Sequence, residues 1–295
     1  MIEKYEVVGD SGNRYIVSYD KKRNLWLCSC PRFIYQRKKL EEKEPCKHIL
    51  YVQSLSQEDK EKLKKGVYVN RLEALRKNGF VILGFVYNYV WKAEEEKKEM
   101  RLRAERLKQN GKIERWISIN EGDIYYLLIK PKYDWYEERV KEFEDELNNA
   151  FDEIKNANSV YLKSRTLFGV RTIFTEYDHL KDEYEELVQL VLYNKSGEIN
   201  KNISTEEFNH LNNRLLKLDK KLDELKKLVE EKDEIYTPKV IEGLKECIRE
   251  NIGLARRLMV EYRNSLIGSK YYKEIMNFEK NLENGKYERK QSKKG

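Results

Sequence analysis

Apolar positions near the start of the chain follow the pattern of short strands. Three segments, residues 5–8, 14–19 and 24–28, are rich in β-branched and aromatic residues. Turn-forming residues separate these segments, as expected for an antiparallel meander. After these strands the apolar positions suit a short helix instead; they are Ile49, Leu50, Val52 and Leu55. Residues 1–57 are therefore predicted to form a small module of the ββα type.

Residues 58–133 combine a long apolar run with a charged segment and a predicted hairpin. The run Phe80–Trp91 suits a buried strand or a buried helix, because periodicity does not separate the two. Lys92–Asn110 is largely charged and predicts a solvated helix. Two apolar segments flank the turn Asn120–Asp123, which predicts a hairpin. We therefore expect a basic α+β middle segment in this part of the chain.

From Asp134 onward the spacing of apolar residues predicts helices. They recur at steps of three and four, which is the period of an amphipathic helix. Asp134 with Glu137, and Ser204 with Glu207, form the pattern of a capping box at a helix start. Thr237–Pro238 predicts another start, because proline is favoured at the first helical position.

One apolar stripe within residues 134–285 is regular enough to predict how its helix packs. Its members alternate by steps of three and four, which keeps them on one face of a helix. They are Phe208, Leu211, Leu215, Leu218, Leu222, Leu225 and Val229. Short predicted linkers favour packing against neighbouring helices of the same chain, so a helical bundle is the main interpretation. A coiled coil with a second chain, either a homodimer or another protein, is the alternative.

Charge is spread unevenly along the 295 residues, a length that suggests two or three domains. The formal net charge is +7, with 38% of the residues charged and 40% hydrophobic. Residues 1–134 carry 29 basic and 20 acidic side chains, whereas residues 135–295 carry 30 and 32. A polyanion is therefore expected to bind the first half, or the basic tail 286–295, which is predicted to be disordered. The abundance of Lys and Glu resembles proteins of hyperthermophiles.

The sequence predicts neither a leader nor a membrane span. Charged residues follow Met1 and Ile2 at once, unlike in a signal peptide. The longest uncharged apolar run has 12 residues, whereas a helix that spans a bilayer needs about 20. We therefore expect a soluble, cytoplasmic protein without a membrane partner.

Three of the four cysteines and one of the three histidines lie close together in the sequence. Cys28 and Cys30 are two residues apart at the end of a predicted strand, so both thiolates point to the same side. Cys46 and His48 follow at the start of the predicted helix. Three thiolates and one imidazole complete the tetrahedral shell of one structural Zn²⁺ ion. The alternative is three small core cysteines beside an unrelated histidine.

The expected fold is therefore α+β. A ββα-type zinc module (1–57) and an α+β middle segment (58–133) come first. A long, mostly helical bundle or coiled coil (134–285) follows, and the tail (286–295) ends the chain.

The residues around the four ligands resemble the SWIM zinc finger, a family defined by the pattern CxC…CxH on a ββα framework. The similar segments are 15–18, 25–31 and 45–49, and the resemblance covers residues 1–57 only. It implies a module that binds DNA or protein, with a zinc ion held by Cys28, Cys30, Cys46 and His48. A charged insert at 32–44 departs from the family pattern.

The insert and the turn before it carry candidate contacts for nucleic acid. Cations neutralise phosphates, and interleaved aromatic rings stack on unpaired bases. The candidates are Lys21, Lys22, Arg23, Arg32, Phe33, Tyr35, Arg37, Lys38 and Lys39. Because Glu41, Glu42 and Glu44 follow directly, a solvated charged loop is the alternative.

These observations together predict a non-enzymatic protein without a small-molecule substrate. The sequence contains no phosphate-binding glycine loop and no nucleophile elbow, and the expected zinc shell has no open position. The favoured function is binding of DNA or RNA by the basic N-terminal half, with the helices for positioning or assembly. The alternative is a protein adaptor that docks a recombination or nucleoprotein partner through the zinc module or the helical stripe. A transposase-derived enzyme is a third interpretation, for which spacing identifies no catalytic acids.

Overall fold

The computed structural model describes residues 2–162, 171–193, 199–250 and 252–284. These residues form helices and small antiparallel sheets, which confirms the α+β class. The predicted tail 286–295 lies outside the described residues. The chain divides into two compact units, Met1–Glu138 with Gln189–Leu211 and Arg139–Val188 with Asn212–Gly295.

The first unit begins with a three-stranded antiparallel sheet in the order β1-β2-β3. Its strands lie close to the three predicted segments, and Asn24, in the left-handed conformation at a φ of 51°, ends the β2–β3 turn. The strands are β1 (Ile2–Val8), β2 (Arg14–Asp20) and β3 (Leu25–Cys28). Short helices follow: α1 (Pro31–Ile34), the 3-10 turn η1 (Leu40–Glu42), α2 (Lys47–Gln53), α3 (Gln57–Lys64) and α4 (Arg71–Lys77).

A second three-stranded sheet, in the order β4-β6-β5, includes part of the apolar run that could have formed a strand or a helix. Its strands are β4 (Val81–Tyr87), β5 (Ile113–Glu121) and β6 (Ile124–Pro131). Residues 81–87 of the run form a strand, since β4 pairs with β6 from Val81 opposite Ile129 to Tyr87 opposite Ile124. Residues 88–91 form a turn, and most of β4 is partly buried or exposed, so the expectation of a buried element is wrong. The predicted hairpin is confirmed as β5–β6, and the predicted charged helix as α5 (Ala93–Gln109).

One hydrophobic core joins the two sheets of the first unit. Its buried members include Val17, Ile49 and Leu75, together with Ile117 and Leu128 from the second sheet. The core therefore crosses the predicted boundary after residue 57. The helix α5 covers the other face of the second sheet, since it contacts all three of its strands and buries its own Ala104 there.

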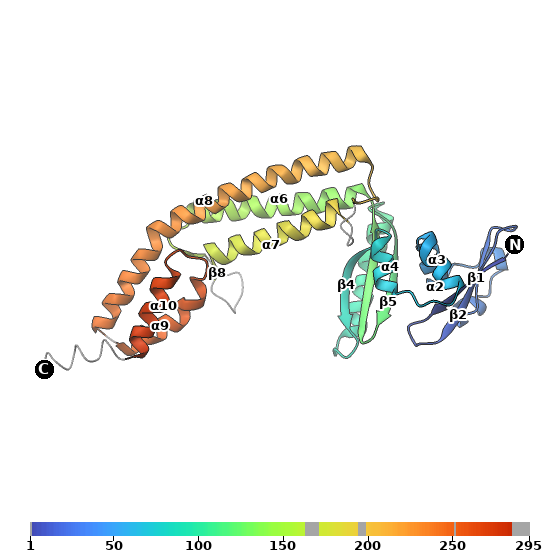
Figure 1. Cartoon of the computed structure of the whole chain (residues 1–295), viewed down its shortest axis with the longest axis horizontal. Coiled ribbons are helices and arrows are strands. Elements are labelled where there is room, and N and C mark those ends of the chain that lie inside the picture. Colours follow the sequence, from blue (N-terminus) through green and yellow to red (C-terminus); the bar gives the residue numbers. More distant parts are fainter. Residues whose placement is uncertain (1, 163–170, 194–198, 251, 285–295) are drawn as a thin grey trace. The chain divides into compact units, whose positions relative to one another are not determined.

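Three long helices lie side by side in the second unit (Figure 1). They are α6 (Tyr133–Asn156), α7 (Ile173–Leu192) and α8 (Thr205–Glu250), and α9 (Ile252–Ser265) and α10 (Tyr272–Glu283) follow them. The Tyr184 hydroxyl donates to the Leu215 carbonyl at 2.9 Å, and Arg214 pairs with Glu144 at 2.7 Å. A pairing of two-residue strands, β7 (Tyr161–Leu162) with β8 (Arg171–Thr172), interrupts the stretch that was predicted to be helical.

One of the three predicted helix starts is wrong, and another differs by one residue. Ser204 and Glu207 form the predicted capping box, because the N–H of each residue donates to the side chain of the other. Asp134 is instead the second residue of α6, which begins at Tyr133. Pro238 lies inside α8 rather than at the start of a new helix.

The buried Asp233 explains why α8 continues past Pro238. Proline has no N–H to donate to the preceding turn, which ordinarily ends or kinks a helix. The Asp233 carboxylate accepts hydrogen bonds from the Thr237 hydroxyl at 2.5 Å, the Ser269 hydroxyl at 2.8 Å and the Lys270 N–H at 3.0 Å. These contacts hold the turn before Pro238 against the connection between α9 and α10. Tertiary contacts thus outweigh the local signal for a helix start.

The predicted apolar stripe of α8 is buried within the chain. Its buried members are Leu211, Leu215, Leu218, Leu222, Leu225 and Val229, and Phe208 is partly buried. These side chains therefore belong to the chain's own core. Burial by helices of the same chain favours the bundle interpretation over a coiled coil or partner interface through the stripe.

Truncation of one stripe residue measures this burial. Leu222→Ala is expected to lower the free energy of unfolding by about 2–4 kcal/mol, because a buried leucine leaves a cavity. Leu216→Ala, on the same helix but 51% exposed, is the matched control, with an expected change of less than about 0.5 kcal/mol. Urea denaturation followed by circular dichroism gives both values. Equal losses of unfolding free energy in the two variants would contradict the burial of the stripe within the chain. A wild-type dimer that Leu222→Ala dissociates would also contradict it.

Candidate metal centre

Four potential metal ligands converge where β3 ends and α2 begins. Cys28 is the last residue of β3 and pairs in register with Val17 of β2. Cys30 lies at the N-cap of α1, so the chain turns directly after the second thiol. Cys46 is the N-cap of α2 and His48 is its second residue. A strand end and two helix starts therefore fix the backbone of all four ligands.

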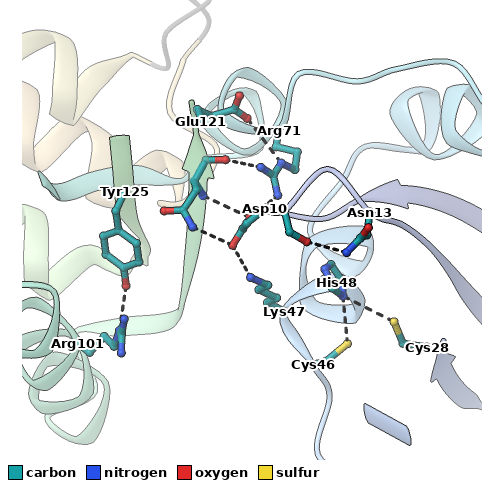
Figure 2. A network of polar contacts seen from close by, with 12 residues as sticks. Asp10, Asn13, Cys28, Cys46, Lys47, His48, Arg71, Arg101, Glu121 and Tyr125 are labelled. Atoms are coloured by element: carbon teal, nitrogen blue, oxygen red, sulfur yellow. Dashed lines mark hydrogen bonds and ion pairs between the residues drawn. The ribbon is translucent and has the colours of Figure 1, made fainter. Parts of the chain in front are cut away.

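The ligand atoms have the spacing of a tetrahedral zinc site. All four lie within 4.8 Å of one another, and all four residues are buried. The sulfur atoms of Cys28 and Cys46 lie 3.8 and 3.9 Å from His48 Nδ1 (Figure 2). Ligands at about 2.0–2.3 Å from Zn²⁺ are separated from one another by roughly 3.5–3.8 Å. The residues therefore fit one metal ion, as the sequence predicts, and zinc suits the sulfur-rich donor set.

Packing against Tyr15 holds the side of the His48 imidazole that faces away from the sulfur atoms. Its ring lies against Tyr15, with the ring centroids 4.6 Å apart. Within the described part of the chain, His48 Nε2 is buried and has no hydrogen-bond partner. A Cβ atom at Gly9 would lie 2.6 Å from the Tyr15 ring and 3.2 Å from Nε2, so only glycine fits there. Gly9 and Tyr15 thus hold Nδ1 toward the three sulfur atoms.

Hydrogen bonds within the cluster favour a thiolate at Cys46, and burial opposes ionisation of the other two thiols. Hydrogen bonds from the Cys28 thiol, His48 and the Ile49 N–H lower the pKa of Cys46 to about 4. The bond to Cys46, together with burial, raises the pKa of Cys28, and burial raises the pKa of Cys30. A divalent cation supplies the positive charge that ionises the two remaining thiols.

A second set of contacts links the metal centre to the second sheet through Asp10. Lys47, between two of the ligands, donates to the Asp10 carboxylate, as do Arg71 of α4 at 2.6 Å and the Asn120 N–H of β5 at 3.4 Å (Figure 2). Arg71 also donates to the Asn120 carbonyl and lies 3.6 Å from Glu121. Burial opposes ionisation of Asp10, but the hydrogen bonds from Lys47 and Arg71 outweigh it and lower the pKa.

Sequence reasoning missed this network. Asp10 stands among turn-forming residues and reads as part of a hairpin loop. Its partners Arg71 and Asn120 lie 61 and 110 positions away, so no local pattern connects them.

The predicted nucleic-acid contacts lie in two separate groups in the structure, and one residue, Phe33, is not available for such a contact. Arg32, Tyr35, Arg37, Lys38 and Lys39 are exposed on the insert that joins Cys30 to Cys46. Phe33 is buried in the core beneath the ammonium of Lys43, which lies 5.2 Å from the ring centroid. The prediction that Phe33 stacks on a base is therefore wrong, because its ring has no open face.

The second group lies on a different turn. Lys21, Lys22 and Arg23 are exposed between β2 and β3, at the end of β3 opposite to the ligands. Lys21 lies 3.2 Å from Glu3. The four residues of β3, at about 3.3 Å per residue, separate this turn from the metal site.

The second unit also has a group of potential ligands. Glu146, His179 and Glu183 place one ligand atom each within 4.8 Å of the others, but the two glutamates and the histidine lie on the helix surface. His179 Nε2 lies 3.6 Å from Glu183, as expected for a surface histidine beside a carboxylate four residues away.

No family model, no curated protein and no solved structure matches this chain. The resemblance to SWIM zinc fingers therefore rests on the ligand spacing and the flanking residues of 1–57. Within the described ranges, each helix is too short or too polar to cross a membrane.

Loss of one ligand tests the metal centre. Cys28→Ser is expected to abolish stable zinc binding and to raise hydrogen exchange in β2, β3 and α2, because the metal contributes folding free energy. Cys247→Ser removes the cysteine outside the cluster and serves as the control. Elemental analysis and hydrogen-exchange mass spectrometry give both readouts. One zinc ion per chain in both variants, or none in the reconstituted wild type, would overturn the assignment.

The Asp10 network has a pH signature. Asp10→Asn is expected to lower the free energy of unfolding by about 1–3 kcal/mol at neutral pH. Because the folded-state pKa is lowered, this contribution is present above the ordinary carboxyl pKa of about 4 and is lost as the pH falls through the folded-state value. The difference between variant and wild type in urea should therefore shrink on acidification.

The exposed Asp123, on the turn between β5 and β6, provides the control for this measurement. Asp123→Asn is expected to leave the free energy of unfolding nearly unchanged at every pH. A difference between Asp10→Asn and wild type that persists in acid would show that Asp10 acts through its shape and not through its charge.

Proposed function

We propose that this chain is a non-enzymatic protein with a structural zinc ion in a SWIM-like module, and that its first unit binds nucleic acid. One observation carries the proposal. The insert between Cys30 and Cys46 presents two exposed cations, Arg37 and Lys39, that form no ion pair with a carboxylate within the described residues. Surface cations without partners are available to phosphates, whereas paired ones are largely neutralised.

The metal ion has a structural role in this proposal. Three thiolates and one imidazole complete a tetrahedral shell, so no position is left for a reacting water molecule. Bound at Cys28, Cys30, Cys46 and His48, the ion closes the insert into a loop whose two ends are ligands.

Hydrogen bonds within the insert support a defined shape. Gln36 and Glu44 exchange two hydrogen bonds at 2.8 Å each. Lys43 Nζ donates to the carbonyl groups of Phe33 and Ile34 at 3.0 and 2.9 Å. A loop that is ordered before binding loses less conformational entropy on the ligand, so its cations bind phosphates more effectively.

The charges within the insert are partly separated by sign. Lys38 pairs with Glu44 at 2.7 Å, so one of the three glutamates that follow the cations is already neutralised. Tyr35 is 80% exposed and lies among the cations, where its ring is available to a base. The turn Lys21–Arg23 adds a second positive surface at the far end of β3.

Charge reversal tests the proposal. The double variant Arg37→Glu/Lys39→Glu is expected to weaken nucleic-acid binding by at least about tenfold and to reduce the slope of log K against log salt by about two. Reversal of the exposed Lys226 and Lys227 of α8 is the matched control, with little change expected. Fluorescence anisotropy with labelled DNA and RNA at two salt concentrations measures both effects.

Zinc content shows that the variants remain folded. A wild-type protein that binds no nucleic acid, or binding that does not weaken with salt, would overturn the proposal. Equal losses in the insert variant and in the α8 control would also contradict it, because they would show that only net charge matters.

A further inference from the structure

The end of β4 and the turn after it expose a row of aromatic side chains. Phe85 and Tyr87 belong to β4, and Tyr89 and Trp91 to the turn that leads into α5. Their exposed fractions are 54%, 40%, 75% and 96%. We call these four residues the aromatic row. Burial of large aromatic rings is a main source of folding free energy, so four neighbouring exposed rings require an explanation.

Strand alternation places Phe85 and Tyr87 of the row on one face of the second sheet. Val86, between two members of the row, is buried on the face that α5 covers. On the same side, a Cβ atom at Gly84 would lie 2.5 Å from the sulfur of Met100 in α5. Successive side chains of a strand point to opposite faces, so Phe85 and Tyr87 point away from α5.

The face that bears the row is covered only in part. Toward β5 it belongs to the hydrophobic core, where Ile117 and Leu128 are buried. Toward β4, which is an edge strand, the face opens and carries Phe85 beside Tyr126 of β6, with their ring centroids 6.2 Å apart. The exposed rings thus continue the core outward onto the surface.

Three of the four rings, those of Phe85, Tyr87 and Tyr89, contact one another. The centroids of Phe85 and Tyr87 are 5.8 Å apart in an edge-on arrangement, and those of Tyr87 and Tyr89 are 5.4 Å apart. Such contacts hold exposed rings in position before a ligand arrives, which lowers the entropy cost of binding.

Cations flank the row, which bears on what it binds. Arg76 of α4 lies close enough to Tyr126 for the two groups to interact electrostatically, and Lys92 follows Trp91 directly. Neither cation has an ion-pair partner among the residues that the structure describes. Asp123 contributes one carboxylate nearby, since its carbonyl accepts the N–H of Asn88 at 2.8 Å. The exposed Glu94, Glu95 and Glu96 follow at the start of α5, where Glu94 pairs with Lys97 at 2.6 Å.

We infer that the aromatic row is a binding surface for single-stranded nucleic acid, whose bases stack on Phe85, Tyr87, Tyr89 and Trp91. Every base has a π face, so such a surface tolerates any sequence, and Arg76 and Lys92 neutralise the adjacent phosphates. In a duplex the bases are already stacked inside the helix and do not reach the rings. The inference rests on the proposed function and adds a strandedness and a second contact surface to it.

The test uses the zinc-loaded full chain and three labelled probes: an oligothymidylate, an oligouridylate and a mixed-sequence duplex of the same length. Tyr89→Ala/Trp91→Ala is expected to weaken binding of both single strands by about tenfold or more. Duplex binding should change less than about twofold. Tyr68→Ala, an exposed tyrosine outside the row, is the matched control and should leave all three affinities unchanged.

Tryptophan fluorescence gives a second readout. Stacked bases quench an indole, so the single strands should quench the emission of Trp91, and Trp91→Phe should remove that quenching while it retains most of the affinity. The better of the two single strands identifies DNA or RNA as the ligand, and either result supports the inference.

Three outcomes separate the inference from the proposed function. Row variants that bind single strands as tightly as the wild type, while the Arg37→Glu/Lys39→Glu variant does not, would overturn the inference and leave the proposed function intact. Equal losses for single strands and duplex would also overturn the inference. A wild-type protein that binds none of the probes would overturn both, and a protein ligand for the row would then be the remaining explanation.

Discussion

Three buried thiols and one imidazole around a common point are the constraint on which the first unit depends. Charge in such a cluster is costly, because each additional thiolate is repelled by its neighbours and shielded from water. Hydrogen bonds from Cys28, His48 and the backbone offset part of this cost at Cys46. A divalent metal ion stabilises all three thiolates, provided that β3 and the starts of α1 and α2 hold the four ligands within reach of it.

The consequences of this constraint extend well beyond residues 1–57. Lys47 lies between two ligands and contacts Asp10, which in turn contacts Arg71 and Asn120. The hydrophobic core likewise runs from Val17 of the first sheet to Leu128 of the second. The metal centre, α4 and the second sheet therefore form one structure, in which the cations of the insert and the aromatic row are held on a common framework.

Patterns with a short range in sequence were sufficient to predict some of these features. The ligands follow from spacings of two residues at a strand end and a helix start, and the β5–β6 hairpin follows from two apolar segments around a turn. Features that depend on distant contacts were not predictable. Phe33 is buried because the insert folds back on it, α8 passes Pro238 because Asp233 anchors it, and Asp10 finds partners on α4 and β5. The exposed rings of the aromatic row were not predictable, because they lie in an apolar run that is typical of a buried element.

X-ray absorption spectroscopy at the zinc edge tests the central claim most directly, because it reports the ligands of the bound metal without a mutation. The account predicts one zinc ion per chain with three sulfur ligands at about 2.3 Å and one nitrogen ligand at about 2.0 Å. A shell of oxygen and nitrogen ligands, or a sulfur count below three, would show that Cys28, Cys30 and Cys46 do not hold the metal together. The organisation of the first unit around that ion would then have to be abandoned.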